Sequence, residues 1–225
     1  KSKEKEATAQ LIISTTHQLL RFSDAFDVMI IDEIDAFPYH NDQSLQFATK
    51  RAVKQVSSII YLTATPRDKL KRKVKFNKLP YCFIPVRYHG YPLPIPHLIA
   101  DFSLQKQLKN KNLPKSFLRW LDERENRKRQ ILIFVPTIQL ANELTEPVTE
   151  ILLQKKLIYK RTEVVSVHAE DEEREEKILS FRNKNIYLLI TTTILERGVT
   201  FPSVDVVVLR ANHKVFDEAA LVQIA

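Results

Sequence analysis

Residues 27–35, with the sequence DVMIIDEID, constrain the fold of this chain more than any other stretch. The apolar run at 28–31 has the β-branched bias of a strand that is buried on both faces of a parallel sheet. Three carboxylates follow this run directly, on Asp32, Glu33 and Asp35. Because open α/β folds bind ligands at the carboxyl ends of their strands, we expect these acids at a ligand site.

Two adjacent acids at such an edge can act separately on a phosphate substrate. One of Asp32 and Glu33 would hold Mg²⁺, and the other would orient or deprotonate an attacking water. The alternative is an exit loop that is merely polar and caps the next helix.

A second apolar run favours the functional interpretation. Residues 59–62 read as another buried strand and are followed by Thr63 and Thr65. If the two strands are neighbours, both threonine hydroxyls are expected to reach Asp35.

The pairing of DEID with TATP resembles motifs II and III of the helicase-like nucleic-acid motor ATPases, which are built from two RecA-like lobes. Further words narrow the resemblance: ISTTHQLLRF (13–22), IIDEIDAFPY (30–39), YLTATP (61–66), RYHGYPLPIP (87–96) and TTTILERGVTFP (191–202). Together they resemble the late-competence DNA-uptake ATPase family, ComFA, over residues 11–225.

The resemblance implies an α/β chain with two RecA-like parallel-sheet lobes of the helicase-type P-loop NTPase fold, both truncated. We expect residues 1–80 in the first lobe, a Pro-rich and basic connection at 81–115, and the second lobe at 116–225, cut before its last motif. The apolar periodicity predicts strands at 11–15, 131–135, 164–167, 187–191 and 204–209, and helical segments at 16–22, 44–57, 116–128, 137–154, 171–183 and 216–225. Pro147 is expected to kink or interrupt its helix.

The resemblance also implies roles for individual residues. Asp32, with Mg²⁺, and Glu33 are the expected catalytic pair. The residues expected to couple the motifs are Asp35, Thr63, Thr65, Arg197, Gly198 and Gln223. Those expected at nucleic acid are Thr15, Thr16, His17, Thr137, Thr191, Thr192 and Thr193. For Thr15 and Thr16 the alternative is that one of them caps the following helix.

Two departures from the family pattern limit what this chain would do. No Gly-rich phosphate loop occurs in the sequence, which holds two glycines, and the arginine-finger motif would begin at Gln223. We therefore expect a segment that is inactive alone, from a parent that couples ATP hydrolysis, with Mg²⁺, to DNA translocation. Thr200 stands where many related motors carry an acid, which puts a contact from there to the nucleotide sugar in doubt.

The net charge of +8 suggests a polyanionic partner, and the resemblance implies single-stranded DNA and the competence DNA-uptake machinery at the membrane. Residues 67–78 carry seven basic residues and one acid. This run either follows a nucleic-acid backbone or is a solvated surface.

The single cysteine, Cys82, and the histidines show no zinc-ligand spacing, and nothing matches the family's four-cysteine zinc element. No apolar run has the length of a membrane span, so a cytoplasmic protein, at the inner face of the membrane, is expected.

Two rival functions stay open. One is another helicase-like DNA motor of the replication-restart or restriction type, against which the word RYHGYPLPIP argues. The other is a non-hydrolysing nucleic-acid-binding scaffold that keeps the same fold.

Overall fold

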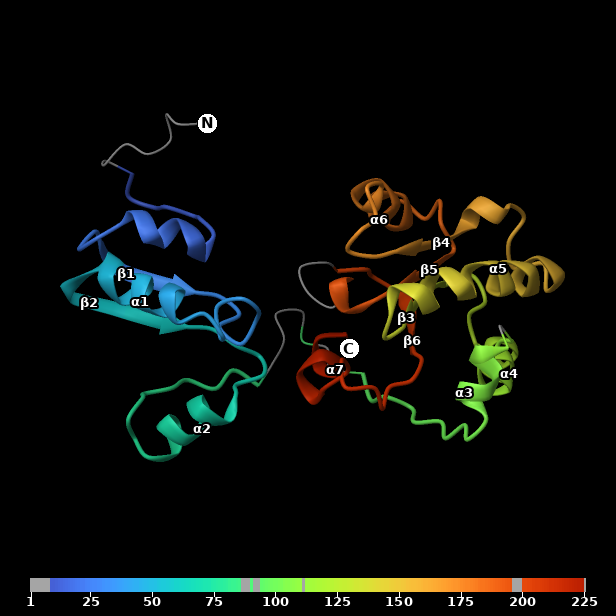
Figure 1. Ribbon diagram of the computed structural model, residues 1–225, viewed down its shortest axis with the longest axis horizontal. Coiled ribbons are helices and arrows are strands. Elements are labelled where there is room, and N and C mark those ends of the chain that lie inside the picture. Colours follow the sequence, from blue (N-terminus) through green and yellow to red (C-terminus); the bar gives the residue numbers. More distant parts are fainter. Residues whose placement is uncertain (1–8, 86–89, 91–93, 111, 196–199, 225) are drawn as a thin grey trace. The chain divides into compact units, whose positions relative to one another are not determined.

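The computed structural model of the chain describes residues 9–85, 90, 94–110, 112–195 and 200–224. Two compact units, Lys1–Pro85 and Val86–Ala225, each contain a parallel sheet with helices against it (Figure 1). The expected α/β class and parallel pairing are confirmed in both units. None of the helices in the described part of the chain is long and apolar enough to cross a membrane.

The first unit is built on two parallel strands with a helix crossing between them. Its elements are η1 (Thr16–Arg21), β1 (Phe26–Ile31), α1 (Gln43–Ala52), β2 (Val53–Tyr61) and α2 (Asp68–Lys75). Asp42 caps α1, because its carboxylate accepts hydrogen bonds from the backbone N–H groups of Ser44 and Leu45. Met29 and Ile31 of β1 pack with the buried face of α1 and with Leu19 of η1.

Three expectations for this unit are wrong. The strand β1 is buried on one face only, since Val28 and Ile30 are 58% and 62% exposed. The helix predicted at 44–57 ends at Ala52, where the chain passes directly into β2. Residues 11–15 form no strand, because β1 and β2 pair only with each other among the described residues, and Ile13 is 89% exposed.

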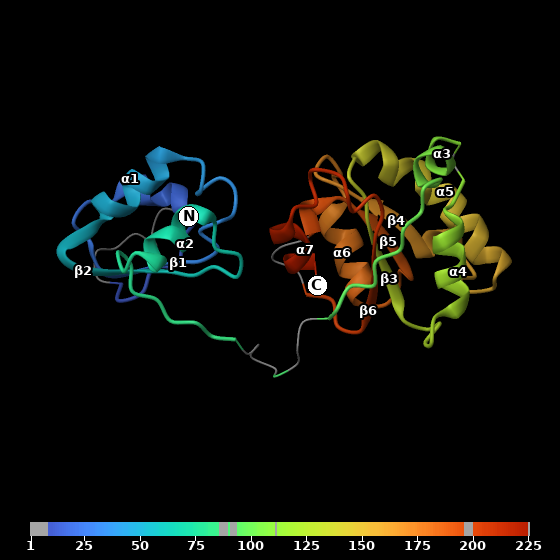
Figure 2. The same ribbon diagram turned by 90° about the horizontal axis from the view of Figure 1, so that it is seen from below.

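The second unit contains a four-stranded parallel sheet in the order β4-β5-β3-β6. Its elements are α3 (Leu104–Lys109), α4 (Lys115–Glu123), β3 (Gln130–Phe134), α5 (Ile138–Gln154), η2 (Arg161–Glu163), β4 (Val164–Val167), α6 (Arg174–Arg182), β5 (Leu188–Thr191), η3 (Thr193–Leu195), β6 (Val204–Val208) and α7 (Glu218–Ile224). Alternate residues of the central strands enter two separate cores, so that Ile131 and Ile133 face one way and Leu132 and Phe134 the other. Helices α3, α4 and α5 cover the first face and α6 and α7 the second, which gives three layers (Figure 2).

Several boundaries in this unit differ from the sequence prediction. Strand β4 has the predicted bounds, whereas α6 begins at Arg174 instead of 171 and α7 at Glu218 instead of 216. Helix α5 runs unbroken through Pro147, so the predicted interruption is wrong. Buried residues lie on both sides of Pro147 in α5, and their packing outweighs the lost hydrogen bond. Leu108 and Leu113, from the range assigned to the connection, belong to the core of this unit.

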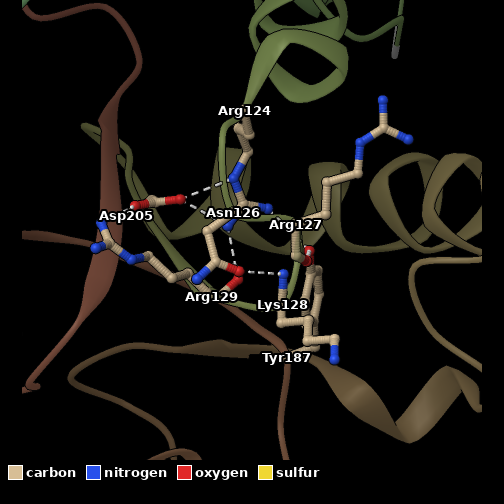
Figure 3. Close-up of polar contacts among 7 residues, drawn as sticks. All are labelled: Arg124, Asn126, Arg127, Lys128, Arg129, Tyr187 and Asp205. Carbon is tan, nitrogen blue, oxygen red and sulfur yellow. Dashed lines mark hydrogen bonds and ion pairs between the residues drawn. The ribbon is translucent and has the colours of Figure 1, made fainter.

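A buried arginine explains why α4 ends at Glu123 instead of continuing to 128. Arg124, whose side chain is 2% exposed, leaves the helical conformation and forms an ion pair with Asp205 of β6, from Nη2 to Oδ2, at 2.7 Å. Its guanidinium also donates to the Tyr187 hydroxyl at 2.8 Å and to the Arg129 carbonyl at 2.6 Å (Figure 3). Trp120 is half-buried against the first core, and the Arg124 guanidinium lies 5.3 Å from the centre of its ring.

Candidate functional site

The carboxylate pair lies in a tight turn that leaves β1 at its carboxyl end. Asp32 is exposed, and its Oδ1 accepts a hydrogen bond from the backbone N–H of Glu33 at 2.9 Å. Glu33 has a φ of 50°, in the left-handed region that residues other than glycine rarely adopt. The Glu33 carbonyl accepts the N–H of Ala36 at 2.8 Å, which closes the turn. A strained backbone conformation next to two acids is typical of a functional site.

Asp35 connects this turn to the end of β2. Its carboxylate accepts two short hydrogen bonds, from Thr63 Oγ1 to Oδ1 at 2.6 Å and from Thr65 Oγ1 to Oδ2 at 2.7 Å. Asp35 is only 5% exposed and both threonines are half-buried, so the two bonds are partly shielded from water. The predicted contact of Asp35 with both threonines is therefore present.

Further hydrogen bonds hold the two strand ends together. The N–H of Leu62 donates to the Ile31 carbonyl at 2.9 Å, and the N–H of Ile34 donates to the Leu62 carbonyl at 3.2 Å. Arg67, which sequence reasoning did not place in the site, donates from its guanidinium to the Asp35 carbonyl at 3.2 Å. Burial, together with the neighbouring Tyr39, raises the pKa of Tyr61 at the end of β2. The turn and the threonine segment are thus one hydrogen-bonded unit.

The donor set of this turn fits magnesium held together with a nucleotide. Mg²⁺ is commonly bound through one or two carboxylates plus substrate phosphates and waters, and Asp32 offers one exposed carboxylate at a strand end. No group of three or more His, Cys, Asp or Glu residues with the geometry of a metal site occurs among the described residues. Asp32 would therefore hold Mg²⁺ together with ligands from phosphate and water.

The three threonines at 191–193 differ in their surroundings. Thr191 is fully buried at the end of β5, and its hydroxyl donates to the Val167 carbonyl at 2.9 Å. That geometry is a sheet contact and leaves no hydroxyl for a direct phosphate contact. Thr192 and Thr193 are half-buried where the chain leaves the sheet. Thr137 is exposed and caps α5, since its Oγ1 accepts the N–H of Leu140 at 3.2 Å.

Thr15, Thr16 and His17 lie at the start of η1. Thr15 and His17 are exposed and Thr16 is half-buried. Thr15 occupies the N-cap position of η1, but its side chain makes no capping hydrogen bond, so the structural alternative for this residue is not supported. Gln223 is half-buried in α7, whereas Arg197 and Gly198 lie outside the described residues.

Two polar side chains that the sequence analysis did not single out lie at strand ends of the second unit. His168 directly follows β4, and Arg210 lies two residues beyond β6. The Nδ1 atom of His168 and the Nε atom of Arg210 are buried and have no hydrogen-bond partner among the described residues. Both are polar residues that come shortly after an apolar strand, and this pattern in the sequence could have indicated them as candidates for a site.

Comparison with known proteins first defines the class of this chain. The family "Helicase conserved C-terminal domain" matches residues 109–225, which include the whole four-stranded sheet. Yeast (S. cerevisiae) Dbp5, in a structure with RNA and ADP BeF3, superimposes with a TM-score of 0.62 at 20% identity, over 100% of this chain and 57% of that chain. The class is therefore a helicase-like α/β protein.

Two curated relatives then identify the family. Competence protein ComFA of Bacillus subtilis (strain 168) is 46% identical over 224 residues, which cover 100% of this chain and 46% of the relative. Competence protein ComFA of Streptococcus pneumoniae is 39% identical over 95% of this chain and 48% of the relative. The chain belongs to the ComFA family and spans about half the length of these two relatives.

Proposed function

We propose that the longer protein to which this chain corresponds is an ATP-driven translocase of single-stranded DNA that acts in DNA uptake during bacterial competence. The similarity to the ComFA competence proteins and the matched helicase domain support the class of activity. The observation that carries the proposal is the connection of the acidic turn, through Asp35, to Thr63 and Thr65. We place the protein in the cytoplasm, at the inner face of the membrane, with the DNA-uptake machinery as its partner.

The acidic turn would carry the hydrolytic chemistry. We assign Mg²⁺ binding to Asp32, and the metal would neutralise charge on the phosphates of ATP. We assign the orientation of the attacking water, and acceptance of its proton, to Glu33. Asp35 touches no phosphate in this scheme. It would instead pass a displacement of the turn to the threonine segment after β2, because two buried hydrogen bonds join them.

Contacts to DNA would come from short polar side chains that lie outside the cores. We assign Thr15, Thr16 and His17 in the first unit, and Thr137, Thr192 and Thr193 in the second, to the phosphate backbone. Arg197, Gly198 and Gln223 are proposed to couple nucleotide to DNA. The chain itself contains no Gly-rich phosphate loop, and we expect it to hydrolyse no ATP alone.

The test is the ATPase activity of the full-length protein with and without single-stranded DNA. A motor is expected to hydrolyse ATP faster when DNA is present and to lose this activity in the Glu33→Gln variant. A non-hydrolysing scaffold would bind DNA without any stimulated hydrolysis, and that result would refute the proposal.

A further inference from the structure

The first unit carries a strongly basic surface that none of the roles above uses. It comprises helix α2 and the residues around it, and we call it the α2 surface: Arg67, Lys69, Lys71, Arg72, Lys73, Lys75 and Lys78. All seven side chains are exposed, and Asp68 is the only acid in residues 67–85. Figure 1 shows α2 set apart from the layer formed by α1, β1 and β2.

The cations of α2 are exposed, whereas its two apolar residues are half-buried. Leu70 and Val74, four positions apart and therefore on one side of the helix, are half-buried, and α2 has no fully buried residue. Like charges four residues apart, such as Lys71 and Lys75, weaken an isolated helix. Packing of two apolar side chains offsets this repulsion only weakly, so an anionic partner would stabilise α2.

Exposed aromatic side chains accompany these cations. Phe76 follows the last residue of α2 and is 66% exposed, and Tyr81 and Phe83 are 72% and 77% exposed. The end of α2 is fixed, since the N–H of Lys78 donates to the Lys73 carbonyl at 2.8 Å and that of Phe76 to the Arg72 carbonyl at 3.1 Å. Cations and exposed rings in one segment are the combination with which proteins bind single-stranded nucleic acid, the cations at phosphates and the rings at unpaired bases.

We propose that the α2 surface is a contact site for single-stranded DNA, with the cations at phosphates and Phe76, Tyr81 and Phe83 stacking on bases. The inference rests on the proposed function in taking single-stranded DNA as the partner. An anionic membrane is the less favoured partner, because α2 has only two apolar side chains, Leu70 and Val74, whereas a helix that lies in a membrane surface needs a large apolar face.

The site is also attached to the acidic turn. Arg67, the residue that precedes α2, donates to the Asp35 carbonyl at 3.2 Å. A DNA strand held by α2 would therefore pull on a helix whose N-cap residue, Arg67, is hydrogen-bonded to the turn that carries Asp32 and Glu33. This connection gives the contact a route by which DNA could influence hydrolysis.

The experiment measures binding of the full-length protein to fluorescein-labelled oligothymidylate over a range of salt concentrations. The test variant is Lys71→Gln/Arg72→Gln/Lys73→Gln, in which glutamine keeps helix propensity. A matched control, Lys106→Gln/Lys109→Gln/Lys115→Gln, removes the same charge from exposed positions in the second unit. For three lost phosphate contacts, the slope of log affinity against log salt becomes shallower by about 2 in the test variant. The control is expected to keep the wild-type slope.

A second variant distinguishes stacking on unpaired bases from binding to a lipid surface. Phe76→Leu/Tyr81→Leu/Phe83→Leu keeps apolar side chains and loses the rings, so oligothymidylate affinity is expected to fall about tenfold or more with little change of slope. Vesicles of phosphatidylglycerol and phosphatidylcholine are the parallel probe. Loss of vesicle binding in the lysine and arginine variant, with DNA binding unchanged, would overturn the inference in favour of a membrane surface.

The remaining outcomes separate this inference from the proposed function. If the wild-type protein binds oligothymidylate and the test variant matches the control, the contact of the α2 surface with DNA is refuted while the proposed function stands. If the wild-type protein binds no oligothymidylate, both are refuted. An equal loss of affinity for duplex DNA in the aromatic variant would refute the assignment to unpaired bases.

Discussion

Thr63 donates from its Oγ1 to Oδ1 of Asp35 across 2.6 Å, and this hydrogen bond joins the carboxyl ends of β1 and β2. The other carboxylate oxygen accepts from Thr65 at 2.7 Å, so both oxygens of a buried acid are satisfied by hydroxyls. Buried charge is tolerated only where it is hydrogen-bonded, which makes the three residues interdependent.

Asp35→Asn is expected to lower the free energy of unfolding of this chain by about 1–3 kcal/mol. In the wild type both threonine hydroxyls donate to carboxylate oxygens of Asp35. In the variant one of these oxygens is replaced by an NH2 group, which cannot accept, so one of the two hydrogen bonds is lost. Urea denaturation measures the change. Asp32→Asn, at an exposed position in the same turn, is the control and should stay within about 0.5 kcal/mol of the wild type. Equal effects of the two variants would contradict the structural role of Asp35.

Glu33→Gln in the full-length protein should preserve ATP binding and lower the rate of hydrolysis by about a hundredfold or more. The amide keeps the size of the side chain but cannot accept a proton from water. A filter-binding assay for ATP and a steady-state assay of phosphate release separate the two effects. Turnover near the wild-type rate would remove Glu33 from the mechanism.

Asp32→Asn should instead raise the Mg²⁺ concentration needed for half-maximal hydrolysis. Asparagine offers a neutral oxygen in place of a carboxylate, and Mg²⁺ prefers charged oxygen ligands. The measurement is a magnesium titration of the ATPase of the full-length protein at saturating ATP. An unchanged midpoint would count against Asp32 as the metal ligand.

The sequence predicted the features that depend on strand ends and missed those that depend on distant partners. Asp35 could be matched to Thr63 and Thr65 because the ends of neighbouring parallel strands lie at one edge. One-sided burial of β1 could not be predicted, because an apolar run does not say which faces the rest of the fold covers. The burial of Arg124 could not be predicted either, since its partners Asp205 and Tyr187 lie 81 and 63 residues away along the chain.

The end of helix α1 was predicted wrongly for a local reason. Val53 and Val56 fit the apolar period of the preceding helix, yet their β-branched side chains suit a strand, and pairing of β2 with β1 decided the outcome. Among the residues predicted to bind nucleic acid, the sequence could not distinguish Thr191 from Thr192 and Thr193, because burial at a strand end is a property of the assembled sheet.

Arg124→Gln is expected to lower the free energy of unfolding by about 3–5 kcal/mol, because it leaves Asp205 partly buried without its main ion pair. Arg129→Gln is the matched control. Arg129 pairs with the same carboxylate at 3.4 Å, but its side chain is 51% exposed, so its loss should cost less than about 1 kcal/mol. A similar cost for both variants would show that Asp205, and not the burial of Arg124, dominates this network.

Thr191→Val is expected to lower stability and Thr192→Val to lower the affinity for DNA, although the two residues are neighbours. Thr191 is fully buried and donates to the Val167 carbonyl, so its substitution should cost about 1–3 kcal/mol of stability and leave the affinity for DNA unchanged. Thr192 is half-buried and proposed to contact phosphate, so its substitution should weaken binding of single-stranded DNA by about two- to tenfold at unchanged stability. Urea denaturation and fluorescence anisotropy with a labelled oligonucleotide measure the two properties in parallel. If Thr192→Val binds DNA as the wild type does, the phosphate contact does not lie at this residue. A weaker affinity in Thr191→Val at full stability would instead return the contact to the buried position.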